Sequence, residues 1–162
     1  MSSAVVVGIA RNPEERAQAL DFIRTQYLHY FNTTPPEAEH LFCAWNGSEV
    51  VGTMGLDAGT ATHPVQLQRM YRCPSLPLPA TSESSVQFGR WVVTKWYVSG
   101  PLTYAACEYG LALGRHYGWC EHTTTVHRVA VRFGIQFHNV PGAELIMEEG
   151  APVRGPSDRM KL

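Results

Sequence analysis

One stretch, residues 86–119, constrains the fold of this chain more than any other, because it predicts a strand, a short loop and a helix in succession. Residues 86–93 read Val-Gln-Phe-Gly-Arg-Trp-Val-Val, a β-branched and aromatic run whose interior Gly89 suits a bulge. Residues 99–101, Ser-Gly-Pro, supply a helix start, since Ser or Gly caps a helix and Pro is tolerated in its first turn. An apolar stripe at helical spacing then runs to Tyr117, and Gly118 suits a left-handed helix end.

The residues before this stretch predict a strand, a helix and a hairpin. Residues 4–10 are a valine-rich apolar run, and Asn12-Pro13 followed by two acids starts a helix that should end before Thr33. The pair Asn46-Gly47 separates the apolar runs 41–45 and 50–56, which is a strong hairpin signal.

Residues 58–85 interrupt this regular pattern with four prolines and a polar Ser/Thr stretch. Residues 63–72 suit a short helix within it. A connection this long is unusual inside a compact domain, so it is either a substrate-facing segment or a connection with no role.

After the central stretch, residues 120–126 predict a strand parallel to strand 86–93, residues 127–133 a short helix closed by Gly134, and residues 143–148 a final strand. This order predicts an α/β fold with a mixed, mostly antiparallel sheet flanked by helices. With 162 residues and 44% hydrophobic content, we expect a single domain over residues 1–162.

Several classes of protein are excluded by composition and spacing. A net charge of -1 gives no field that attracts nucleic acid, and no apolar run has the length of a membrane span. Cys43, Cys73, Cys107 and Cys120 are scattered, without a C-x-x-C pair or a secretory leader, which predicts reduced thiols in a cytoplasmic protein. The spacing of Cys120, His122 and His127 fits no standard zinc pattern, so no metal site is expected.

The strand motif Gln87-Phe88-Gly89-Arg90-Trp91-Val92-Val93 resembles the Glu-x-Ser/Gly-Arg-aromatic-x-Val pattern of the acyl-homoserine lactone (autoinducer) synthases and N-acyl amino acid synthases. The order of elements resembles the wider GCN5-related N-acetyltransferase (GNAT) superfamily. This resemblance implies an acyl-CoA N-acyltransferase fold in which the fourth and fifth strands, 86–93 and 120–126, splay apart. It also implies an acyltransferase moving an acyl group from a thioester to an amine, either an amino acid or a homoserine-lactone-like acceptor.

The resemblance implies no tightly bound cofactor but an acyl-CoA or phosphopantetheine-linked acyl donor as co-substrate, with acyl carrier protein as a candidate partner. Ordinary acetyl-CoA enzymes place Gln/Arg-x-x-Gly-x-Gly/Ala after this strand, whereas Lys95 to Gly100 lacks the middle Gly and Pro101 removes an N–H. Both departures favour a donor held mainly through its phosphopantetheine arm. The alternative is that this segment is only a helix start. The candidate donor-binding residues are Trp91, Val92, Val93, Lys95, Ser99, Gly100 and Leu102.

The general base is the open question of the predicted site. Gln87 stands where the resembling families have a carboxylate, and an amide orients a substrate but cannot take up a proton at neutral pH. Glu83 and Asp57 are candidate replacements, each with the alternative of a plain surface charge. Arg90 is the strongest candidate site residue, because a buried guanidinium must meet a carboxylate or face a cleft. Its alternative role is a structural ion pair.

A bulge at Gly89 would bring Gln87 and Arg90 to one side of the strand, and amides near Trp91 would then stabilise an oxyanion. Tyr104 is a candidate acid for the leaving thiolate. Arg24, Asp57, Phe88 and Phe133 are candidate substrate-binding residues, with Tyr109 a further aromatic of the acyl pocket, although such aromatics are commonly core. Two alternatives to the synthase remain: a non-catalytic binding module that lost its base, and a small-molecule N-acetyltransferase using acetyl-CoA.

Overall fold

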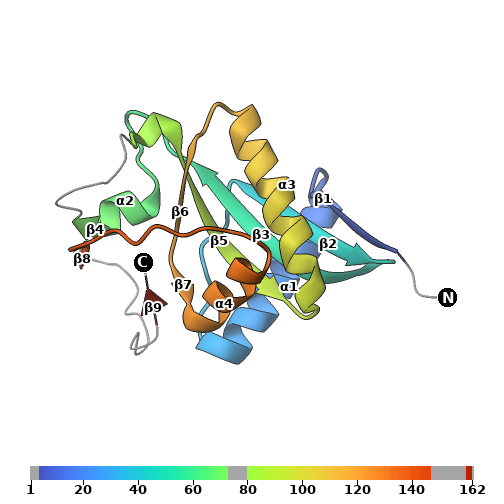
Figure 1. Cartoon of the computed structure of the whole chain (residues 1–162). Helices are drawn as coiled ribbons and strands as arrows, with labels where there is room; N and C mark the ends of the chain where they lie inside the picture. The colour runs from blue at the N-terminus through green and yellow to red at the C-terminus, as the bar shows by residue number, and fades with distance from the viewer. Residues whose placement is uncertain (1–3, 73–79, 147–159, 162) are drawn as a thin grey trace. The chain divides into compact units, whose positions relative to one another are not determined.

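The computed structural model describes residues 4–72, 80–146 and 160–161 (Figure 1). In chain order, the elements are β1 (Val5–Ile9), α1 (Pro13–Phe31), β2 (His40–Asn46), β3 (Glu49–Ala58), α2 (Gln66–Met70), β4 (Tyr71–Arg72), the 3-10 turn η1 (Ser82–Ser84), β5 (Ser85–Val93), the 3-10 turn η2 (Trp96–Val98), α3 (Ser99–Ala112), β6 (Tyr117–Cys120), β7 (His122–Thr123), α4 (Thr124–Arg132), β8 (Glu144–Leu145) and β9 (Met160–Lys161).

The main sheet has five strands in the order β1-β2-β3-β5-β6, and β1 and β3 both pair antiparallel with β2. This mixed α/β architecture, with a mostly antiparallel sheet and helices, confirms the predicted fold class. The chain divides into two compact units, Met1–Asp57 with Phe88–Leu113 and Ala58–Gln87 with Gly114–Leu162, so β5 has residues in both.

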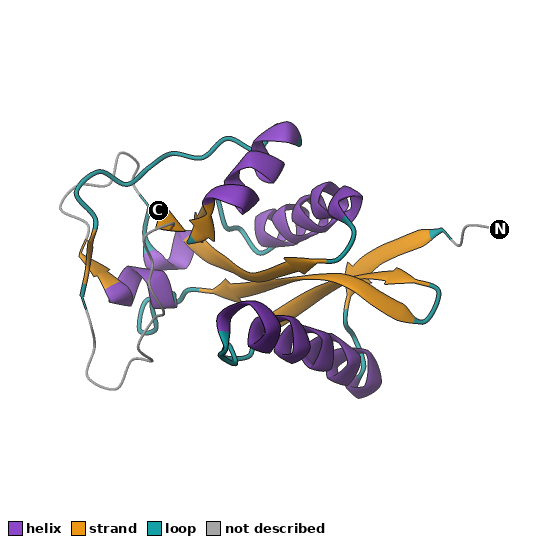
Figure 2. Ribbon diagram, turned by 90° about the horizontal axis from the view of Figure 1, so that it is seen from below, coloured by secondary structure: helices purple, strands orange, loops and turns teal. Residues whose placement is uncertain are grey.

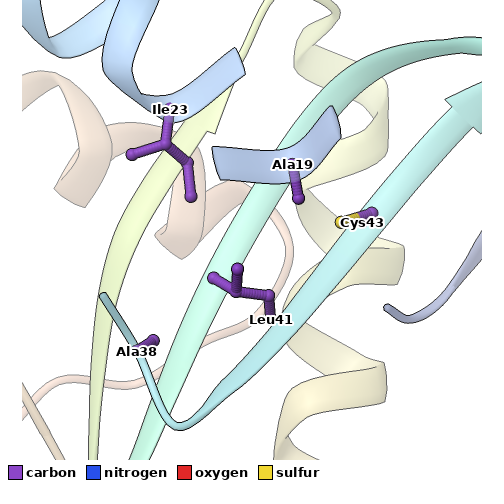
Figure 3. Close-up of a cluster of buried hydrophobic side chains, with 5 residues drawn as sticks. All are labelled: Ala19, Ile23, Ala38, Leu41 and Cys43. Carbon is purple, nitrogen blue, oxygen red and sulfur yellow. The ribbon is translucent and has the colours of Figure 1, made fainter. Parts of the chain in front are cut away.

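In the first unit, β2 is covered by a helix on each face, which Figure 2 shows as helices on both sides of the strands. Leu41 and Cys43 point toward Ala19 and Ile23 of α1, and all four side chains are buried (Figure 3). On the opposite face, the rings of residues 40 and 42 contact Tyr109 of α3, with ring centroids 4.8 and 5.5 Å apart. Because alternate residues of a strand point to opposite faces, β2 is buried on both sides.

The first helix forms as its sequence predicts. Asn12 accepts a hydrogen bond from the N–H of Glu15 at 2.8 Å, and Pro13 occupies the first helical position. The helix ends at Phe31, and Asn32 follows in the left-handed conformation with φ 50°. The hairpin β2–β3 is also confirmed, with Gly47 at φ 66° in its turn.

The close approach of α3 to β3 explains why position 52 is a glycine. A Cβ on Gly52 would lie 2.9 Å from side-chain atoms of both Leu102 and Val98. Only a residue without a side chain therefore lets the start of α3 lie this close to β3.

The end of α3 differs from the sequence prediction. The helix stops at Ala112, and Gly114, with φ 73°, takes the left-handed position expected of Gly118. Tyr117 and Gly118 instead lie in β6, and the N–H of His116 already donates to the carbonyl oxygen of Ser84 at 2.9 Å. An apolar stripe could not reveal this end, because Tyr117 fits a helix face and a strand equally well.

In the second unit, the predicted strand 120–126 is also wrong in extent. It is replaced by the end of β6, the two-residue β7 and the first residues of α4, which runs to Arg132 and is followed by Gly134 at φ 79°. The short helix expected within 63–72 is confirmed as α2. The predicted strand 143–148 is observed as β8, and its last two residues lie outside the described part of the chain, as do residues 73–79 and most of the tail.

Two short antiparallel pairs, β4 with β8 and β7 with β9, complete the second unit. Among the helices that the structure describes, none is both long and apolar enough to cross a bilayer.

Candidate functional site

Arg90 is the residue at which β5 departs from regular strand geometry. Its φ is 50°, the only positive φ at a non-glycine residue of a strand in the described chain. The left-handed conformation costs a residue with a side chain about 1–2 kcal/mol. Gly89 has no positive φ, so the irregularity expected at Gly89 is centred one residue later. Surrounding contacts must therefore hold Arg90 in place.

Those contacts come from two other stretches of the first unit. The guanidinium forms an ion pair with the carboxylate of Asp57 and donates to the carbonyl oxygens of Pro36 at 2.9 Å and Glu37 at 3.1 Å. The backbone carbonyl of Arg90 accepts from the hydroxyl of Thr53 at 3.1 Å. Arg90 is 7% exposed, so the expectation that a buried guanidinium meets a carboxylate is confirmed, and its role in the reaction stays a prediction.

Both carboxylate oxygens of Asp57 accept hydrogen bonds. Oδ2 bonds Arg90, and Oδ1 accepts from the backbone N–H of Glu39 at 2.7 Å. A Cβ on Gly55 would lie 2.7 Å from Ala38 and 3.0 Å from the Arg90 side chain, so the strand before Asp57 passes close to both. A carboxylate engaged in this way supports Arg90, and the roles of Asp57 as a base and in substrate binding stay predictions.

Gln87 is buried, with 6% of its surface exposed, and its Oε1 accepts the backbone N–H of Leu67 at 2.8 Å. The Gln87 side chain thereby holds the first turn of α2, and both belong to the second unit. An amide oxygen that already accepts one hydrogen bond retains a lone pair for a substrate N–H. It still cannot take up a proton at neutral pH.

The remaining candidate catalytic residues are exposed. Glu83 lies in η1 with an exposed side chain. Tyr104 is 66% exposed on α3, where the hydrogen bond and negative charge of Glu108 raise the pKa of Tyr104 above its usual value. A raised pKa makes the phenol a weaker acid toward a leaving thiolate. The roles of both residues stay predictions.

The segment expected to hold the donor begins with half-buried strand residues, Trp91, Val92 and Val93, and continues with exposed Lys95. The 3-10 turn η2 then leads directly into α3. It uses the N–H of Val98, which donates to the carbonyl of Lys95 at 3.1 Å, and the N–H of Ser99, which donates to the carbonyl of Trp96. Two N–H groups that would otherwise be available to an anion are therefore hydrogen-bonded within the chain.

Ser99 itself is 1% exposed, and its Oγ is buried without a hydrogen-bond partner in the described structure. Gly100 is half-buried, and Leu102 is fully buried against β3. Of the predicted donor residues, Leu102 is thus a core side chain. An unpartnered buried hydroxyl at the start of α3 is consistent with a polar ligand group there.

The predicted substrate-binding residues differ in how exposed their side chains are. Arg24 is exposed on α1, and its guanidinium lies 3.8 Å from the carboxylate of Glu37. Phe88 is half-buried in β5, and Phe133 is 37% exposed after α4. Tyr109 packs on β2, so this aromatic belongs to the core, which was the alternative given for the aromatic residues in the sequence analysis.

One polar pair in the second unit was missed by the sequence analysis. The hydroxyl of Tyr71 donates to Oε1 of Glu121 at 2.9 Å, and both residues are half-buried. Fifty positions separate them in the chain, so no local pattern signals the contact. The only available signal was an acid, Glu121, inside the strand predicted over residues 120–126.

His122 and His127 form a ring cluster with Phe137. The ring centroids lie 5.2 Å apart for the two histidines and 4.5 Å apart for His122 and Phe137. Within the residues described, no group of three or more His, Cys, Asp or Glu side chains is arranged to hold a metal ion. The described cysteines, Cys43, Cys107 and Cys120, are free thiols.

Neither models of known protein families nor curated protein sequences match the chain. Solved structures match it well. The AHL synthase LasI aligns over 85% of this chain and 82% of its own, with a TM-score of 0.62 and 12% identity. FeeM, an N-acyl amino acid synthase from uncultured soil microbes, aligns over 77% and 75%, with a TM-score of 0.51 and 15% identity. A GNAT-family acetyltransferase from Staphylococcus aureus Mu50 aligns over 81% and 82%, with a TM-score of 0.53 and 11% identity.

The chain therefore has the GNAT-like fold of acyl- and acetyltransferases. Within that fold, its structural neighbours include an AHL synthase and an N-acyl amino acid synthase, which are the two families that the motif of strand 87–93 resembles. At these identities the likeness establishes the fold. The activity has to be argued from the residues.

Proposed function

We propose that this protein is an N-acyltransferase that moves an acyl group from a thioester to the amine of an amino acid or a homoserine-lactone-like acceptor. The observation that carries the proposal is the geometry of Arg90. The motif shared with the synthases coincides with the strained residue of β5, and four described contacts hold that residue in place. Strain that is maintained in this way is typical of functional sites.

The reaction has a simple balance. The amine nitrogen attacks the thioester carbonyl carbon, a C–N bond forms, the C–S bond breaks, and the proton lost by nitrogen goes to the departing sulfur. The protein has to orient the amine, stabilise the oxyanion and move one proton. Gln87 suits orientation, and amides near Trp91 are the candidate oxyanion donors.

We expect the donor to be an acyl chain on phosphopantetheine, presented by acyl carrier protein or by CoA, and held mainly through that arm. The 3-10 turn η2 supports this expectation, because N–H groups that a pyrophosphate would need at the start of α3 are already hydrogen-bonded to carbonyls of the turn. The same observation weighs against an ordinary acetyl-CoA enzyme.

A non-catalytic binding module is the second candidate. It is favoured by Gln87, which replaces the carboxylate of the resembling families and whose oxygen already accepts the N–H of Leu67. Such a protein would bind the thioester without turning it over.

The test is incubation of the purified protein with acyl carrier protein thioesters and acyl-CoA thioesters of several chain lengths, each against a panel of amino acids and homoserine lactone. Products are identified by mass spectrometry, and thiol release is measured in parallel. An acylated amine that forms only with protein present supports the proposal. Thioester binding in calorimetry, with no acylated amine for any pair, establishes the binding module instead.

A further inference from the structure

The second unit places a carboxylate beside the segment that Gln87 contacts. Gln87 of β5 accepts the N–H of Leu67, at the start of the segment 66–72, and Glu121 accepts the hydroxyl of Tyr71, at its end. Two side chains that bind the same short segment must both be directed toward it. Gln87 and Glu121 therefore both hydrogen-bond to the segment 66–72.

We propose that Glu121 is the general base of the acyl transfer, supplying the proton acceptor that Gln87 cannot be. This inference rests on the proposed function. The carboxylate of Glu121 takes the proton that the amine nitrogen loses as the C–N bond forms. It then passes this proton to the thiolate released when the C–S bond breaks. The carboxylate ends as it began, so no further reactant is needed.

Other acids and bases of the chain fit this role less well. Asp57 is committed to Arg90, and Glu83 is exposed in η1. His122, next to Glu121, is 7% exposed and covered by the rings of His127 and Phe137. Glu121 is half-buried, which leaves it within reach of a substrate while its partner fixes its orientation.

Tyr71 gives the proposal a second variant to test. The hydroxyl of Tyr71 donates to Oε1 of Glu121 and thereby fixes the orientation of the carboxylate. Removing the Tyr71 hydroxyl should therefore slow the reaction by misorienting the base, while the proton acceptor itself is kept.

The test compares pH profiles of kcat/KM for the wild type, Glu121→Gln, Tyr71→Phe and the exposed control Glu49→Gln. Gln retains the oxygen that accepts the Tyr71 hydroxyl, so the fold should persist, which chemical denaturation checks. We expect Glu121→Gln to lower kcat/KM by about 10²-fold or more and to abolish the acid limb. Tyr71→Phe should keep that limb and lower kcat/KM by less than Glu121→Gln does, and Glu49→Gln should match the wild type.

A wild type that acylates an amine, with Glu121→Gln showing the same profile or only a lower rate with an unchanged acid limb, overturns the assignment of Glu121 and leaves the proposed function standing. A wild type inactive with every thioester and amine overturns the proposed function, and the assignment of Glu121 with it.

Discussion

The ion pair of Arg90 and Asp57 yields a sharp stability prediction. In the variant Asp57→Asn, a side chain of nearly the same shape replaces the carboxylate. The guanidinium of Arg90 then keeps the carbonyl oxygens of Pro36 and Glu37 but loses its counter-charge. A cation that is 7% exposed is not rehydrated easily, so the folded state bears the cost.

Removing one partner of a buried ion pair costs about 3–5 kcal/mol. The side chain of Asp57 is 27% exposed, and Arg90 retains two hydrogen bonds, so water and the carbonyls offset part of the loss. We therefore expect the free energy of unfolding to fall by about 3 kcal/mol. For a chain of this size, that corresponds to a decrease in Tm of roughly 6–12 °C.

Urea denaturation followed by tryptophan fluorescence measures this difference, and a double variant with Arg90→Met should lose less than the sum of the single losses. The matched control is Glu37→Gln. Its carboxylate is 54% exposed and lies 3.5 Å from Arg16 and 3.8 Å from Arg24, so its loss should cost less than about 1 kcal/mol. If Asp57→Asn were no more destabilising than Glu37→Gln, the view of Arg90 as a buried cation fixed by its carboxylate would be refuted.

Three other predictions concern activity, packing and thiol chemistry. Gln87→Glu should fold normally, since a carboxylate also accepts the backbone N–H that the amide now accepts, and a steep rise in turnover on this change would show that the natural site is degenerate. Gly52→Ala should lower the free energy of unfolding by about 1–3 kcal/mol because its Cβ would press on α3, whereas Gly8→Ala, whose Cβ would lie 3.9 Å from its nearest neighbour, should cost about 1 kcal/mol at most. Burial raises the pKa of Cys43 from 9.0 to about 12, so at pH 8 its thiolate fraction is about 10³-fold lower than in the unfolded chain, and Ellman's reagent should react with the exposed Cys107 before Cys43. Peptide mapping after partial labelling would contradict this last expectation if Cys43 were modified as fast as Cys107.

Much of the first unit could be predicted because its signals are local. Asn12 and Pro13 begin α1 as their chemistry requires, and the Asn46-Gly47 pair turns the chain between β2 and β3. The alternation of β2 side chains between α1 on one face and α3 on the other likewise follows from the two-residue period of a strand. In each case the deciding residues lie within a few positions of one another.

The features that were missed depend on distant contacts. The sequence places the irregularity of β5 at Gly89, the residue that tolerates unusual geometry, yet Arg90 adopts the left-handed conformation because partners in β3 hold it there. The pairing of Tyr71 with Glu121 is equally invisible to local patterns. The expected opening between β5 and the following strand stays a prediction, as do the roles assigned to the candidate site residues.

The anchoring of Arg90 has a consequence for how such a chain can diversify. Two of its hydrogen bonds end on backbone carbonyls at positions 36 and 37, in the connection from α1 to β2. A carbonyl can be offered by any amino acid, so these positions are free to change identity, but an inserted or deleted residue would move the oxygens away from the guanidinium. Among homologues of this protein, the connection 33–39 should therefore vary in composition and keep its length.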